Sequence, residues 1–141
     1  MSWFVFLIVA AISGVCMAVQ GSINTAAGKI VGLLEGNFIL HVVGLALVSL
    51  LLFVFGLGKG DLSKFTQIPW YGYLGGIINV AIIYGVMYAM KGAGVANATT
   101  AIIVGQVGMA LIVDCFGLFG MEKVPFTYLK DVYKRQEYSR L

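Results

Sequence analysis

The sequence predicts an all-α integral membrane protein, and three observations support this fold class. Of the 141 residues, 60% are hydrophobic and only 11% are charged, whereas about a quarter of the residues in a soluble domain are charged. Four apolar runs reach the length of about 20 residues that a helix needs to cross a bilayer. Short links separate these runs. The composition therefore excludes a soluble domain, a disordered chain and a nucleic-acid-binding protein.

Each predicted helix follows from its own stretch of sequence. The first begins at Trp3 with no basic segment before it, so we expect a retained helix and not a cleaved signal. The second is the run "FILHVVGLALVSLLLFVFGL", and the third follows Pro69 and opens with Trp70 and Tyr71, which are typical of a membrane interface. The short links make successive helices antiparallel neighbours. We expect one transmembrane domain over residues 1–130, with helices at about 3–24, 38–57, 70–90 and 95–119.

Glycines at four-residue spacing occur inside these runs. Gly14 lies between Ala10 and Ala18, and Gly72 precedes Gly76 by four residues. Small residues at this spacing let helix backbones approach closely in lipid. We interpret these three glycines as helix-packing positions.

Polar side chains inside the runs need polar partners, because lipid cannot satisfy an amide or a hydroxyl. The candidates come from three predicted helices. Gln20 and Asn24, four residues apart, share one helix face, and Thr99 and Gln106, seven residues apart, share another. One interpretation is interhelical glue, worth about 0.6–2 kcal/mol per hydrogen bond. The other is the lining of a substrate path, and both stay open for the set as a whole. The substrate-path candidates are Gln20, Asn24, Asn79, Thr99, Thr100 and Gln106.

Depth distinguishes the two polar residues of the fourth helix. A helix that starts at Val95 places Gln106 about 16 Å in, near the middle of a ~30 Å core, and Asp114 about 28 Å in, near the far interface. Gln106 therefore needs a polar partner or a polar cavity, whereas we expect Asp114 to be an interfacial anchor. His41 falls in the first turn of the second predicted helix, where a solvated or capping role is the expected one.

The sequence contains no constellation that indicates an enzyme. We find no Ser-His-Asp set at matching depths, no cluster of metal ligands and no phosphate-binding glycine loop. Cys16 and Cys115 lie in apolar runs and are read as small hydrophobic residues. We therefore expect no catalytic residues, no metal and no cofactor.

Lysines indicate how the helices are oriented in the membrane. With four spans, one side carries the N-terminus, the second link and the tail, and positive residues favour the cytoplasmic side. That side holds four lysines up to residue 130 and the opposite side holds two, namely Lys59, Lys64, Lys123 and Lys130 against Lys29 and Lys91. This bias predicts a cytoplasmic N-terminus.

Three stretches resemble a small bacterial family of unknown function in the drug/metabolite transporter superfamily, related to the small multidrug resistance proteins. They are "AVQGSINTAAGK", "PWYGYLGGIINVAIIY" and "GAGVANATTAIIVGQVGMALIVDCFGLFG". The most specific mark is Gln106 followed by Asp114, Phe116 and Gly117, and Gln20 matches a polar position that closes the first helix. The resemblance covers about residues 1–130. It implies a bacterial plasma-membrane exporter of four to five helices that is built from paired units.

These features together predict a small-molecule transporter that works by alternating access. Four helices form a thin bundle, so we expect a homodimer or a paired homologous subunit, with the lipid bilayer as the other partner and an unidentified small molecule as substrate. The alternative is a non-transporting scaffold or partner subunit. The related multidrug proteins couple export to protons through a glutamate on their first helix, and this coupling does not carry over because residues 3–24 contain no acidic residue.

The last residues, 131–141, differ in composition from the rest of the chain. Five of the eleven residues in "DVYKRQEYSRL" are charged, and "DVYKRQ" matches one reading frame of a transposon end used in preparing sequencing libraries. We expect this tail to be non-native, with a fifth helix of the natural protein missing from this chain. The alternative is a genuine basic tail on the cytoplasmic side.

Overall fold

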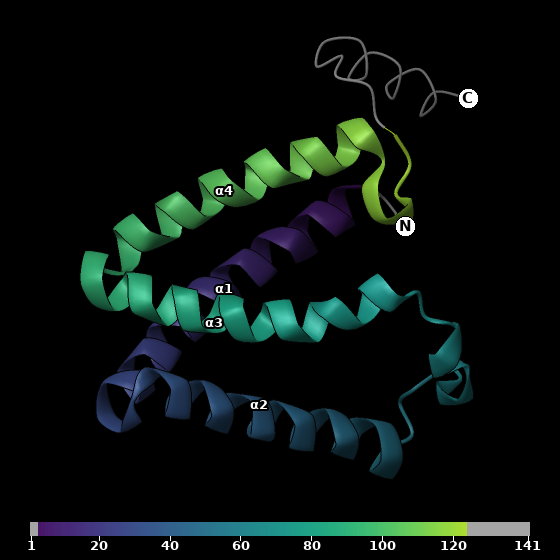
Figure 1. The fold of residues 1–141 in the computed structure, drawn as a ribbon, viewed down its shortest axis with the longest axis horizontal. Coiled ribbons are helices and arrows are strands. Elements are labelled where there is room, and N and C mark those ends of the chain that lie inside the picture. The colour runs from purple at the N-terminus through teal and green to yellow at the C-terminus, as the bar shows by residue number, and fades with distance from the viewer. Residues whose placement is uncertain (1–2, 124–141) are drawn as a thin grey trace. The chain divides into compact units, whose positions relative to one another are not determined.

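The computed structural model describes residues 3–123, and all regular structure within them is helical. Four long helices dominate the fold (Figure 1), namely α1 (Trp3–Val31), α2 (Leu33–Ser49), α3 (Leu74–Ala93) and α4 (Val95–Phe116). Each is long and apolar enough to cross a membrane, once α2 and α3 are counted with the short helices that extend them. This confirms the predicted all-α fold with four membrane-spanning helices. The end of the predicted domain at residue 130 and the predicted tail lie outside the described residues.

The first two helices are longer at their shared end than the sequence predicted. We expected the first helix to end near Asn24 and a link at 28–37, yet α1 runs to Val31 and α2 begins at Leu33. The sequence between them, "TAAGKIVGLLEGN", contains good helix formers and no proline, so the helix continues. Gly32 alone breaks it, with φ at 106°, a conformation that favours glycine.

A second single-residue link joins α3 to α4. Gly94 has φ at 83°, and its N–H donates to the Met90 carbonyl at 3.1 Å. The fourth helix ends at Phe116, three residues before the predicted end at 119. The cause is Gly117, which adopts the left-handed conformation that ends many helices and donates its N–H to the Val113 carbonyl at 2.8 Å.

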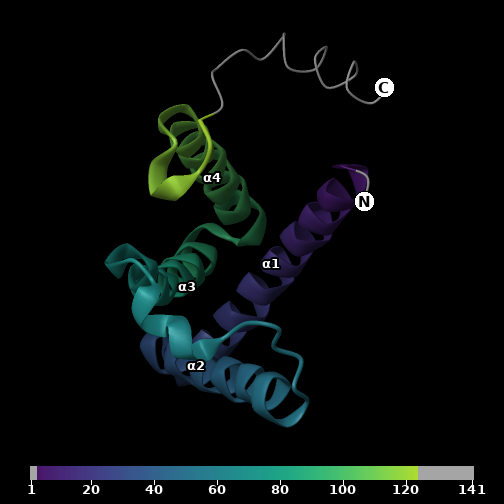
Figure 2. The same ribbon diagram turned by 90° about the vertical axis from the view of Figure 1, so that its right-hand side faces the viewer.

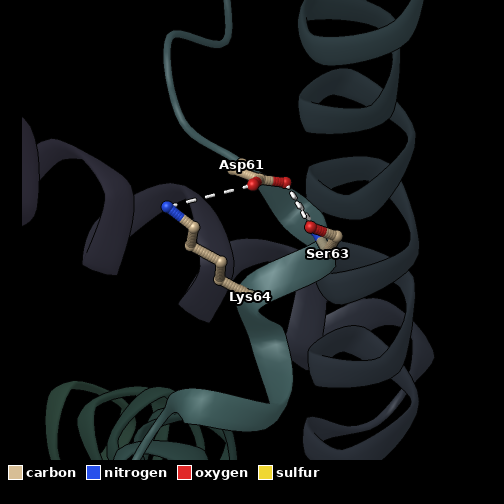
Figure 3. Close-up of polar contacts among 3 residues, drawn as sticks. All are labelled: Asp61, Ser63 and Lys64. Carbon is tan, nitrogen blue, oxygen red and sulfur yellow. Dashed lines mark hydrogen bonds and ion pairs between the residues drawn. The ribbon is translucent and has the colours of Figure 1, made fainter.

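The link between α2 and α3 is longer and carries the short helices. After α2 come a π-helical turn, η1 (Leu50–Val54), and two 3-10 helices, η2 (Leu62–Gln67) and η3 (Trp70–Tyr73). Asp61 caps η2, because its carboxylate accepts from the Ser63 N–H at 3.0 Å and from the Ser63 hydroxyl at 2.6 Å (Figure 3). These bonds hold the pKa of Asp61 below its ordinary range.

The chain divides into two compact units, Met1–Thr99 and Thr100–Leu141, with the boundary inside α4. In the first unit, α1, α2 and α3 all contact one another, and Figure 2 shows the end of α1 meeting the start of α2. Residues 3–17 of α1 are all exposed. The buried packing of this unit therefore begins only after the middle of α1.

Two methionines of α3 form the centre of this packing. Met87 is fully buried, and its terminal methyl reaches both Gly28 of α1 and Gly36 of α2. A Cβ added at Gly28 would lie 2.5 Å from the Met87 methyl, and one added at Gly21 would lie 2.7 Å from the Met90 methyl. Glycine at these positions therefore makes room for a methionine, which is close packing of the kind that stabilises helices in lipid.

Candidate functional site

Polar side chains form hydrogen bonds between α2 and α3 within otherwise apolar parts of these helices. The Asn37 side chain of α2 is only 1% exposed, and its Nδ2 donates to the Val80 carbonyl of α3 at 2.8 Å. This bond fixes the orientation of the amide, since the reverse orientation would set two oxygens against each other. The Oδ1 atom of Asn37 is buried and has no hydrogen-bond partner among the described residues. The site thus holds a fixed, unsatisfied acceptor.

His41 lies one helical turn after Asn37 and makes the second crossing. Its Nδ1 is 2.8 Å from the Asn37 backbone carbonyl, and its Nε2 is 3.1 Å from Nδ2 of Asn79 on α3. A carbonyl oxygen can only accept, so Nδ1 carries the proton and Nε2 accepts from the Asn79 amide. The ring is therefore neutral in this arrangement. We call Asn37, His41 and Asn79 the polar bridge.

The polar bridge lies inside the candidate membrane spans Leu33–Val54 and Trp70–Ala93. His41 is eight residues after Leu33, which corresponds to about 12 Å along α2. Asn79 is five residues, or about 8 Å, after the start of α3 at Leu74 and fourteen residues, or about 21 Å, before its end at Ala93. Asn37 is buried, His41 is half-buried and Asn79 is exposed, so the bridge is closed at one end and open at the other. An exposed amide at this depth requires a polar neighbour or water, because lipid offers it no hydrogen bond.

The two candidates on α1 differ in their surroundings. Asn24 is buried, on the same part of α1 as Gly21 and Gly28, whereas Gln20 is exposed. The neighbouring Thr25 is also buried and donates its hydroxyl to the Gly21 carbonyl at 2.7 Å. Asn24 thus lies in the packed region of the first unit, and Gln20 does not.

The candidates on α4 fall on both sides of the unit boundary. Thr99 closes the first unit, and its buried hydroxyl oxygen has no hydrogen-bond partner among the described residues. Thr100, Gln106 and Asp114 lie in the second unit, and all three are exposed within it. Asp114 precedes the end of α4 by two residues. The roles of these residues as path lining and anchor stay predictions.

The glycines that pack tightly are not the ones that the four-residue spacing singled out. A Cβ at Gly14 or Gly76 would meet nothing within 4 Å, and one at Gly72 would meet only Ile68 of its own segment. The close approaches are at Gly28 and Gly36, where a Cβ on Gly36 would lie 3.4 Å from the Gly28 Cα. The packing role of Gly14, Gly72 and Gly76 stays a prediction, because these glycines have no such contact among the described residues.

Sequence reasoning missed two members of the polar bridge, Asn37 and His41. It started the second helix at Phe38, so Asn37 fell in a link and His41 in a first turn. The helix begins at Leu33, so the expectation that His41 lies in the first turn and caps the helix was wrong, whereas its solvation stays a prediction. The available signal was their spacing, since residues four apart share a helix face.

Among residues 3–123, no group of three or more His, Cys, Asp or Glu residues could hold a metal ion. The bridge offers amide groups and one imidazole, with no carboxylate and no thiol. Such groups bind and orient small polar molecules, and an imidazole can also exchange a proton.

Searches of curated proteins and of solved structures gave no match to this chain. One protein family does match, over residues 5–132, and its description is "Putative inner membrane exporter, YdcZ". This agrees with the resemblance to a drug/metabolite transporter family and with four helices able to cross a membrane. The match covers most of the chain, so the chain is a multi-pass inner membrane protein that belongs to the YdcZ family of the drug/metabolite transporter type.

Proposed function

We propose that this chain is one unit of a paired exporter that moves a small molecule across the inner membrane by alternating access. The observation that carries the proposal is the polar bridge, which sets an imidazole and two amides between two membrane-spanning helices. Polar groups at this depth are costly and commonly mark substrate or ion pathways. The exporter description of the family supports the same interpretation.

The small amount of burial in the compact unit Met1–Thr99 supports pairing with a second chain. Among its described residues, the buried hydrophobic side chains are Met87, Met90 and Ala98, and Asn79 of the polar bridge is exposed. A path must be enclosed on all sides to keep a polar solute away from lipid. A second copy of the chain, or a homologous subunit, would supply the missing wall, and the N-terminus would lie in the cytoplasm.

The alternative is a scaffold or partner subunit that transports nothing. One observation favours it. The hydrogen bond from Asn37 of α2 to the Val80 carbonyl of α3 is of the kind that holds two membrane helices together. Under this alternative, Asn79 would be covered by a partner helix and dry. The two functions therefore differ in whether a solute leaves the cell when the protein is present.

The test compares small molecules outside and inside cells. Cells that produce the full chain are compared with cells that carry an empty vector, and mass spectrometry measures the ratio of each small molecule in the medium to that in the cells. Two variants at matched membrane levels accompany them. Asn79→Ala removes the open end of the bridge, and Val43→Leu changes a side chain of α2 that is 61% exposed and bonded to nothing polar.

The proposal predicts that at least one molecule is enriched outside when the unchanged chain or Val43→Leu is present. The enrichment should fall at least tenfold with Asn79→Ala, since a tenfold change corresponds to about 1.4 kcal/mol of lost interaction. If no molecule distinguishes producing cells from empty-vector cells, the exporter proposal is wrong and the scaffold is favoured.

A further inference from the structure

His41 is the one histidine of the chain, and its surroundings assign its proton. The Asn37 carbonyl accepts from Nδ1, and Nε2 accepts from the Asn79 amide. Nε2 is therefore an unprotonated nitrogen that faces the open end of the polar bridge. Histidine is the side chain whose ordinary pKa places its charge change near neutral pH.

Asn79 can serve either protonation state of this ring. When Nε2 is bare, the Asn79 NH2 group donates to it, and the Asn79 Oδ1 atom is directed elsewhere. When Nε2 takes a proton from water, it becomes a donor, and the amide must turn over so that Oδ1 accepts. Asn79 has no second side-chain hydrogen bond among the described residues that would resist this rotation.

Asn37 cannot respond in the same way. Its Nδ2 is bonded to the Val80 carbonyl, and its backbone carbonyl holds Nδ1 of His41 in both protonation states. The ring is therefore anchored on one side and free to change its hydrogen bond on the other. Gain or loss of the proton at Nε2 therefore changes the hydrogen bond of Asn79 and leaves the hydrogen bonds of Asn37 unchanged.

No other titratable side chain of α1, α2 or α3 makes a hydrogen bond to the His41 ring among the described residues, so Asn37 and Asn79 are its partners. Glu35 lies six residues before His41 on α2, and a Cβ at Gly32 would meet its Oε2 at 2.1 Å, so its carboxylate points back toward the start of the helix. The hydrogen bonds of His41 go to Asn37 and Asn79. The remaining titratable side chains of these helices are Cys16 and Lys29 on α1 and Tyr84, Tyr88 and Lys91 on α3.

We propose that His41 is a proton-binding site and that Asn79 converts its protonation state into a change of hydrogen-bonding sense at the open end of the polar bridge. With neutral His41, Asn79 presents an acceptor oxygen to a solute. With protonated His41, it presents an NH2 donor beside a positive ring. A solute with a hydrogen-bond donor, such as an amine or ammonium compound, then binds only the unprotonated form.

This inference rests on the proposed export function for its consequence, which is exchange of such a solute for a proton. One proton passes from a hydronium ion to Nε2, releasing water, as one solute leaves, and no other covalent bond forms or breaks. The binding of the proton itself does not depend on transport, so it can be tested alone.

The first experiment is nuclear magnetic resonance on the full chain in lipid nanodiscs, labelled with nitrogen-15 in histidine and asparagine side chains. Any histidine tag is removed, so that His41 gives the one imidazole signal. Above its transition the ring should carry its proton on Nδ1 and not on Nε2. As pH falls, Nε2 should gain a proton, and the Asn79 amide signals should shift with the same midpoint.

Two matched variants sharpen the result. Asn79→Asp sets a carboxylate beside Nε2 and should raise the midpoint by about 1 unit or more, a tenfold gain in proton affinity. Asn97→Asp makes the same chemical change at a residue whose amide bonds the Ala93 carbonyl at 3.1 Å, and it should leave the midpoint within a few tenths of a unit. A neutral ring with its proton on Nε2, or Asn79 signals that do not follow the titration, would overturn the proposal even if a variant fails to fold.

The second experiment measures export from the cells described above between about pH 5 and 8. His41→Gln retains an acceptor oxygen for Asn79 but cannot take a proton. Export by the unchanged chain should depend on pH, and export by His41→Gln should lose that dependence. Absence of export at every pH contradicts the exporter function, whereas export with the same pH profile in both proteins contradicts only the proton site.

Discussion

The packing of Met87 against Gly28 allows a quantitative test of how α1, α2 and α3 are held together. In Gly28→Ala the new Cβ would lie 2.5 Å from the Met87 methyl and 2.9 Å from Cδ2 of Leu33. Carbon atoms in contact prefer about 3.5–4.0 Å, so the methyl must move by about 1 Å. Overpacking of this kind costs about 1–3 kcal/mol. Gly14→Ala is the matched control, because a Cβ there meets nothing within 4 Å.

The assay is unfolding of the purified chain in mixed detergent micelles, followed by circular dichroism. Gly28→Ala should lose about 1–3 kcal/mol of unfolding free energy, and Gly14→Ala should stay within about 0.5 kcal/mol of the unchanged chain. In the double variant Gly28→Ala with Met87→Ala, the contact with the Met87 methyl is removed and only the contact with Leu33 Cδ2 remains. The change Gly28→Ala should therefore cost less in the Met87→Ala background than in the unchanged chain, a clear departure from additivity. Additive losses, or equal losses at Gly28 and Gly14, would refute this account of the packing.

Three further predictions concern the second unit and the long link. Gln106→Leu should insert normally and keep its thermal stability in detergent while export falls, and unchanged export together with unchanged stability would contradict both a path and a glue role for this residue. Asp114→Asn should change the stability of the protein only slightly. A cysteine at position 114 should react with a water-soluble thiol reagent, whereas its full protection would contradict an interfacial position. Because hydrogen bonds from Ser63 lower the pKa of Asp61, the cap should be intact above the ordinary range of an aspartate and be lost as pH falls through the lowered value. Relative to the intrinsic exchange rate, which itself falls with pH, the protection of the Ser63 N–H should therefore decrease in acid. Ser63→Ala should bring the Asp61 midpoint, measured by carboxyl resonance, back toward 3.8.

The four spans were predictable because bilayer thickness imposes a length on each apolar run. Their ends were less predictable, because the same residues can continue a helix or leave it. The segment from Thr25 to Val31 stays helical because it has no proline and its one glycine, Gly28, packs within α1, and the chain turns at Gly32, where a positive φ is tolerated. The glycines and polar residues between 25 and 37 were interpreted as a loop, although they lie within α1 and α2 except at Gly32.

The polar bridge was only partly predictable. Asn79 was a candidate because an amide within an apolar run needs a partner. Its partner, His41, was misjudged because the position of a residue along a helix depends on where that helix begins. The glycine contacts depend in addition on which faces meet, and a four-residue spacing alone does not distinguish Gly14, which is open, from Gly28, which holds a methionine methyl.

The central claim is that the open end of the polar bridge faces water, and thiol accessibility tests it most directly. In a chain with Cys16 and Cys115 replaced by alanine, N79C and V43C are exposed in turn to a membrane-impermeant, water-soluble thiol reagent. Val43 is 61% exposed, lies on the face of α2 opposite His41 and serves as the lipid-facing control. The account predicts that N79C is modified from at least one side of the membrane and that V43C is not. Protection of N79C to the same degree as V43C from both sides would contradict it.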